Sequence, residues 1–136
     1  MARLSKKHKI INYFRYVDDI LIIFDPNHSS TQTILADFNT LHPNLQFTAE
    51  MEENKTTNYL DIAIHRTPSN WQTAIYRKPT ATDTIIQYTS NHPSQHKHAA
   101  VKFLCNRLHT YDLQLDEFLQ EENTIQNILY NNSFPI

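Results

Sequence analysis

Two adjacent carboxylates, Asp18 and Asp19, stand between two short apolar runs, and this pattern constrains the fold more than any other in the chain. The runs cover residues 10–14 and 20–24 and are rich in β-branched and aromatic residues. Runs of this length and composition are typical of β-strands, and the few residues between them predict a tight hairpin. We therefore expect the two acids at the tip of a hairpin.

The adjacent acids need compensation, because neighbouring like charges repel and each carboxylate is costly to desolvate. Two explanations stay open from these residues alone. One is a divalent cation bound by both carboxylates. The other is a solvent-exposed turn in which Asp tolerates an unusual backbone conformation, since the chain has no Gly at any of its 136 positions to supply it.

The segment Tyr16-Val17-Asp18-Asp19 resembles the active-site box of reverse transcriptases. Further segments resemble, in the same order, the reverse transcriptases of Penelope-type retroelements, and the Tyr-Arg-Lys-Pro-Thr stretch at residues 76–80 is the most specific of them. The others are residues 38–48, 59–61, 82–83, 90–93 and 96–97. The likeness covers about residues 10 to 111 and implies the C-terminal palm and the thumb of an RNA-directed DNA polymerase.

This resemblance implies two-metal nucleotidyl transfer with Mg²⁺ as the cofactor. Asp18 would be the catalytic metal ligand and Asp19 its supporting neighbour, while Tyr16 and Val17 would border the primer end or simply pack in the sheet. The other essential carboxylate of the family lies upstream with the fingers and N-terminal palm, and only nine residues precede Ile10. We therefore expect this chain alone not to polymerise.

The partners implied by the resemblance are an RNA template, a DNA primer and deoxynucleoside triphosphates. The net charge is −2, but basic residues cluster, with six basic against two acidic groups in residues 61–111. We expect phosphate contacts from five of them, although solvated surface charges are the alternative. They are Arg77 and Lys78 after a primer-grip-like hairpin, and Lys97, Lys102 and Arg107 in a later helix.

The hydrophobic periodicity predicts an α+β fold. We expect a helix from Ser29 or Ser30 to Leu41, a strand over 45–51 and a polar connection over 52–58. A second hairpin is expected from strands 59–66 and 71–77, followed by helices over 94–111 and 116–130. The expected domains are a palm portion over residues 1–90 and a helical thumb-like segment over 91–136.

No apolar run approaches the 18 residues of a membrane span, and no signal-peptide pattern follows Met1, so we expect a nuclear or cytoplasmic protein. Two other functions stay open. One is a non-enzymatic retroelement remnant that binds only nucleic acid or acts as a small interaction domain. The other is an unrelated metal-binding hairpin protein.

Overall fold

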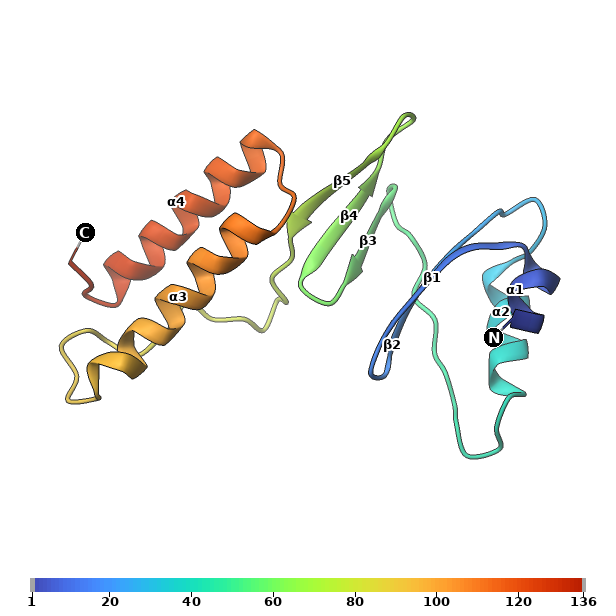
Figure 1. The fold of residues 1–136 in the computed structure, drawn as a ribbon, viewed down its shortest axis with the longest axis horizontal. Helices are drawn as coiled ribbons and strands as arrows, with labels where there is room; N and C mark the ends of the chain where they lie inside the picture. The colour runs from blue at the N-terminus through green and yellow to red at the C-terminus, as the bar shows by residue number, and fades with distance from the viewer. Residues whose placement is uncertain (1, 136) are drawn as a thin grey trace. The chain divides into compact units, whose positions relative to one another are not determined.

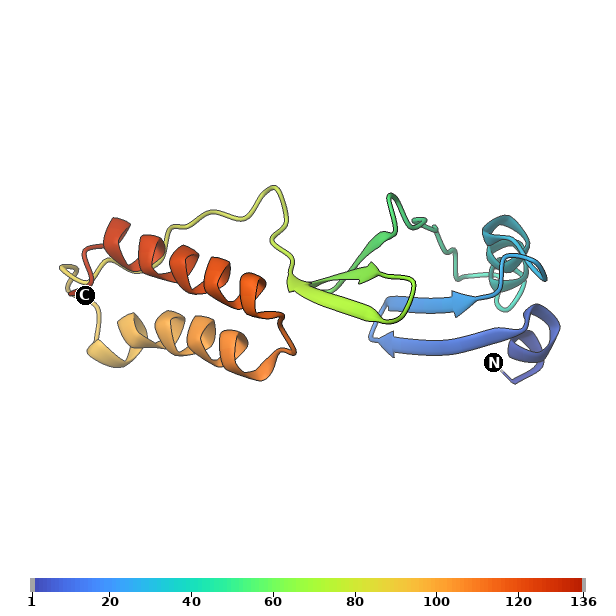
Figure 2. The same ribbon diagram turned by 90° about the horizontal axis from the view of Figure 1, so that it is seen from above.

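The computed structural model describes residues 2–135 and divides the chain into two compact units, Met1–Asn54 and Lys55–Ile136 (Figures 1 and 2). The described residues form four helices and two antiparallel sheets. This confirms the α+β class but not a polymerase palm or thumb. Within the same residues, no helix is long and apolar enough to cross a membrane.

The first unit contains a β-hairpin with one helix on each side of it in the sequence. The hairpin is confirmed, because Tyr16 pairs with Asp19 and leaves Val17 and Asp18 as the two turn residues. The first helix was not predicted from the sequence; it is short, and its last turn carries Lys6, Lys7 and His8. The elements are α1 (Ala2–His8), β1 (Ile10–Tyr16), β2 (Asp19–Phe24) and α2 (Thr31–Asn39).

Helix α2 begins where its capping residues predict. Ser30 is the N-cap: its side chain accepts a hydrogen bond from the Thr33 amide, and the Thr33 side chain accepts one from the Ser30 amide. This reciprocal pair satisfies two amides that a helix start leaves without partners. The apolar face of α2 buries Ile34 and Phe38, which are the buried hydrophobic residues described in this unit.

The prediction of a strand over residues 45–51 is wrong. These residues are irregular, because no strand within residues 2–135 offers them a hydrogen-bonded ladder. Instead the Asn39 side chain donates to the Phe47 carbonyl and accepts from the Phe47 amide, at 3.2 and 2.6 Å. The Phe47 ring also packs edge to face against the Phe38 ring of α2. The alternating apolar residues therefore belong to a loop that this aromatic contact holds against α2.

The second unit starts with a three-stranded antiparallel sheet in the order β3-β4-β5. The predicted hairpin of β4 and β5 is confirmed. Strand β3 occupies the predicted polar connection, where the β-branched residues Thr56 and Thr57 pair with His65 and Ile64. The strands are β3 (Thr56–Tyr59), β4 (Ile62–Arg66) and β5 (Trp71–Ile75).

Two 17-residue helices, α3 (Ser94–Thr110) and α4 (Leu115–Asn131), complete the second unit and confirm both predicted helices. A four-residue connection, 111–114, joins them, and both views show them side by side and running in opposite directions (Figures 1 and 2). The pair is therefore a helical hairpin. Its apolar core consists of Leu104, Leu108, Ile125 and Ile128.

The end of α4 holds the segment before α3 in place. The buried Asn132 side chain donates to the Asp83 carbonyl at 2.8 Å and accepts from the Ile85 amide at 3.2 Å. Ser133 has a φ of 61°, and the Ser133 and Phe134 amides donate to the Tyr130 and Leu129 carbonyls. This is a Schellman motif with Ser at the position that usually takes Gly.

The compact units divide between residues 54 and 55. The predicted functional boundary between residues 90 and 91 stays a prediction, and the sequence on both sides of it belongs to one compact unit. The reason is that Asn132 and the helical core bind the segment before residue 91 to the helices after it.

Candidate nucleic-acid interface

The adjacent acids lie at an exposed turn, as expected. Tyr16, Val17, Asp18 and Asp19 are all exposed. Val17 has a φ of 50°, which is a strained conformation for a β-branched residue. Gly would adopt this φ without strain, but the chain contains no Gly.

Metal binding at this turn would depend on the two Asp carboxylates. No group of three or more His, Cys, Asp or Glu side chains that could hold a metal ion gathers within residues 2–135. Asp18 and Asp19 alone do not provide the converging oxygen ligands of a two-metal centre. Magnesium binding and primer contact at this turn stay predictions.

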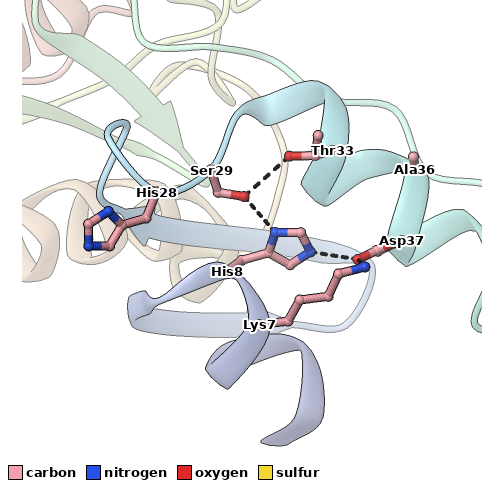
Figure 3. Close-up of a pocket in the computed structure, with 7 residues that line it drawn as sticks. All are labelled: Lys7, His8, His28, Ser29, Thr33, Ala36 and Asp37. Atoms are coloured by element: carbon pink, nitrogen blue, oxygen red, sulfur yellow. Dashed lines mark hydrogen bonds and ion pairs between the residues drawn. The ribbon is translucent and has the colours of Figure 1, made fainter.

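A polar cluster that the sequence did not reveal joins α1 to α2 in the first unit (Figure 3). His8 is buried, with Nε2 at 2.7 Å from Asp37 Oδ2 and Nδ1 at 2.5 Å from Ser29 Oγ. Lys7 Nζ lies 2.6 Å from the same Asp37 oxygen. Hydrogen bonds from Lys7 and His8 lower the pKa of Asp37. The cluster lines a cavity of about 360 Å³.

The order of hydroxyl, imidazole and carboxylate in this cluster is the order found in nucleophilic hydrolases. Here the Lys7 ammonium binds the same Asp37 oxygen as the imidazole, and His8 is only 4% exposed. The contacts therefore favour a structural role in which His8 fastens α1 to Ser29 and Asp37. The partners are 21 and 29 residues from His8, so no local pattern could have indicated them.

Two of the predicted phosphate contacts, Arg77 and Arg107, belong to a partly buried ion-pair network in the second unit. Arg77 donates twice to the buried Glu121 carboxylate, with both distances 2.5 Å. Arg107 lies 3.8 Å from Glu121 and 3.6 Å from Asp61. The Tyr111 hydroxyl donates to Asp61 at 3.1 Å, and burial followed by this bond raises the pKa of Tyr111.

The network explains why β5 and the helices form one unit, since it joins the chain after β5 to both α3 and α4. The Arg107 side chain is 10% exposed, and its buried Nε has no hydrogen-bond partner among the described residues. Both guanidinium groups therefore already face carboxylates, and nucleic-acid contact by Arg77 and Arg107 stays a prediction.

The three predicted lysines differ in their surroundings. Lys97 donates to the Tyr88 carbonyl at 2.7 Å and lies 5.5 Å from the centre of the Tyr88 ring, so it fastens the chain before α3. Lys78 is exposed and lines a cavity of about 430 Å³ beside Asp61 and Arg107. Lys102 is exposed on α3, on the face opposite the buried Leu104 and Leu108.

Charge is segregated between the two helices of the hairpin. Helix α3 contains three basic residues and three histidines and no acidic residue, whereas α4 contains four acidic residues and no basic residue or histidine. The exposed face of α3 would therefore attract a polyanion electrostatically, whereas the surface of α4 would repel it.

Comparison with known families finds one similarity that covers this hairpin. Residues 84–136 match the family model of the animal helix-turn-helix domain. No curated protein and no solved structure matches the chain. The matched region begins within the segment that Asn132 fastens to the helices, so it corresponds to a structural element of the second unit.

The reverse-transcriptase resemblance is therefore wrong. The matching domain is of a DNA-binding type and not a reverse-transcriptase domain, and it occupies the residues that the resemblance assigned to a thumb. The physical reason is that the motif segments are short and lie mostly at turns and loops. The alternative in which an Asp takes the unusual backbone conformation is also wrong, because the positive φ at the hairpin tip belongs to Val17.

Proposed function

We propose that the second unit binds nucleic acid through the exposed face of α3. The match of residues 84–136 to a helix-turn-helix domain carries this proposal. The charge segregation supports α3 as the binding helix, because the cations of the hairpin lie on it and the carboxylates lie on α4. The proposed function needs no catalysis and no deoxynucleoside triphosphate.

The electrostatic part of the affinity is expected to be small. The second unit carries seven basic and seven acidic residues, and Arg77, Arg107 and Lys97 are held by contacts within the protein. Lys102 is the lysine of α3 that remains on the open face. Each phosphate contact contributes about 0.9 to the slope of log K against log salt on duplex DNA, so a shallow slope should result.

The test is fluorescence anisotropy of a labelled 30-base-pair duplex, titrated with the full chain at several salt concentrations. Lys102→Ala should lower the affinity several-fold at low salt and reduce the salt slope by about 0.9. Lys6→Ala is the matched control, because it removes the same charge from an exposed position on α1 in the first unit. Absence of binding at low salt, or equal losses in both variants, would overturn the proposal.

A second candidate function, a small interaction domain, is favoured by an exposed apolar stripe on α4. Leu115, Leu119 and Tyr130 are 74%, 52% and 73% exposed and recur at helical spacing. Exposed apolar side chains in one stripe are typical of protein contacts. Sedimentation of wild type and Leu119→Lys separates the candidates: self-association that the variant abolishes, without DNA binding by wild type, would favour the interaction domain.

A further inference from the structure

Five exposed residues of α3 form one continuous stripe: Gln95, Ala99, Lys102, Asn106 and His109. They are spaced by four, three, four and three residues, which places them on one face of a helix with 3.6 residues per turn. Leu104 and Leu108, which are buried in the core, occupy the opposite face. The stripe therefore points away from the helical core, except at its last residue, His109, whose ring packs 5.8 Å from the Phe118 ring.

The side chains of this stripe are suited to contact with base edges. Asn and Gln form paired hydrogen bonds with adenine, Lys bonds guanine, and Ala contacts the thymine methyl group. The side chains of Gln95, Lys102 and Asn106 have no hydrogen bond or ion pair with any part of the chain from residue 2 to residue 135. Their donors and acceptors are thus available to a ligand.

We infer that α3 lies in the major groove of B-form DNA and reads base edges through Gln95, Lys102 and Asn106. This inference rests on the proposed function and adds sequence selectivity to it. From Gln95 to His109 the helix rises 14 times by 1.5 Å, about 21 Å in all, which corresponds to about six base pairs. The major groove of B-DNA admits an α-helix, whereas the deep and narrow major groove of A-form RNA does not.

In this arrangement the helix that contacts the base edges is α3, the first helix of the pair. In DNA-binding helix-turn-helix motifs the second helix usually enters the groove. Here the second helix, α4, carries Asp116, Glu117 and Glu122 outside the buried network, together with the exposed Leu115 and Leu119. Carboxylates close to phosphates on both sides of a groove would be repelled, so the charge distribution favours α3.

The experiment is selection of preferred sequences from a random duplex library by the full chain, followed by affinity measurements on the selected site. Asn106→Ala should lower the affinity for the selected site by about 5- to 150-fold and leave binding to an unrelated duplex unchanged. It should also relax the preference at one or two adjacent base pairs. Gln95→Ala should act in the same way at a site about five base pairs away.

Asn123→Ala is the matched control, because Asn123 is an exposed Asn on α4 and its loss should leave the preference unchanged. Asn106→Ala improves helix propensity, and equal melting temperatures of the variant and wild type establish that folding is retained.

Failure of this inference can be distinguished from failure of the proposed function. Binding of wild type to every duplex with equal affinity, or an unchanged preference in Asn106→Ala, would overturn base reading and leave nucleic-acid binding in place. Tighter binding to double-stranded RNA than to DNA of the same sequence would also overturn it. Absence of binding to any nucleic acid would remove both.

Discussion

The two units of the chain each use one carboxylate to join two positively charged or imidazole side chains, but in different surroundings. In the first unit Asp37 receives Lys7 and His8, and its side chain is 23% exposed. In the second unit Glu121 receives two arginines and is 5% exposed, one turn from the core residue Ile125. The first cluster is thus near solvent and the second is part of the interior.

The apolar burial of the units differs in the same direction. Among the described residues, the first unit buries Ile34 and Phe38, and its sheet has two strands. The second buries Phe134 and the four core residues of the helical hairpin. A two-stranded hairpin is marginally stable by itself, so the first unit should depend on its polar cluster and the second on buried apolar area and its ion pair.

The largest effect is expected at Glu121. Glu121→Gln should destabilise the protein by about 3–5 kcal/mol, because it leaves the Arg77 guanidinium without a carboxylate partner and leaves Arg107 with Asp61 alone. Urea unfolding followed by circular dichroism measures this change. Glu122→Gln is the control, since Glu122 is exposed, and it should change stability by less than about 0.5 kcal/mol. Equal effects would mean that the network does not stabilise the unit.

A smaller effect is expected at His8. His8→Ala should destabilise the first unit by about 1–3 kcal/mol, because Ser29 and Asp37 lose their shared partner. Hydrogen exchange of the α2 amides reports this unit separately, and the α4 amides should keep their protection. His28→Ala changes an exposed His of the same cavity and should have little effect. Loss of protection in both helices would contradict the independence of the units.

Acid should weaken the first unit through Asp37. Its pKa in the folded protein lies below the ordinary value of 3.8, because Lys7 and His8 bond the ionised form. The stabilisation is therefore fully present above the unfolded pKa and is lost as the pH falls through the lower folded pKa. Protection of α2, corrected for intrinsic exchange, should fall below about pH 4. In Asp37→Asn this pH dependence should disappear.

The smallest effect is expected at the hairpin tip. Val17→Asn should stabilise the first unit by about 0.5–1 kcal/mol, because Asn tolerates the positive φ that Val adopts with strain. Val101→Asn, at a half-buried position in the middle of α3, is the control and should destabilise the second unit. A loss of stability in Val17→Asn would indicate that the Val side chain makes a contact that outweighs its backbone strain.

Local patterns predicted the elements whose signals lie within a few residues. The hairpin around Asp18, the start of α2 at Ser30 and both long helices follow from apolar spacing and capping, which depend on neighbours at positions two to four residues away. The prediction of a strand over 45–51 was wrong, because alternating apolar and polar residues form a strand only where a second strand supplies hydrogen bonds. Strand β3 was missed because its sequence is polar, and it forms a strand only through its hydrogen bonds with β4.

The sequence by itself determined an α+β chain with a two-residue turn at the acids and a helical pair at the end. Tertiary structure decided which charges are available, because Arg77 and Glu121 are 44 residues apart and only packing of β5 against the helices brings them together. The same packing turned Leu104 and Leu108 inward and left Gln95, Lys102 and Asn106 facing solvent. Composition lists the cations of a chain, but burial and pairing select the few that can meet a ligand.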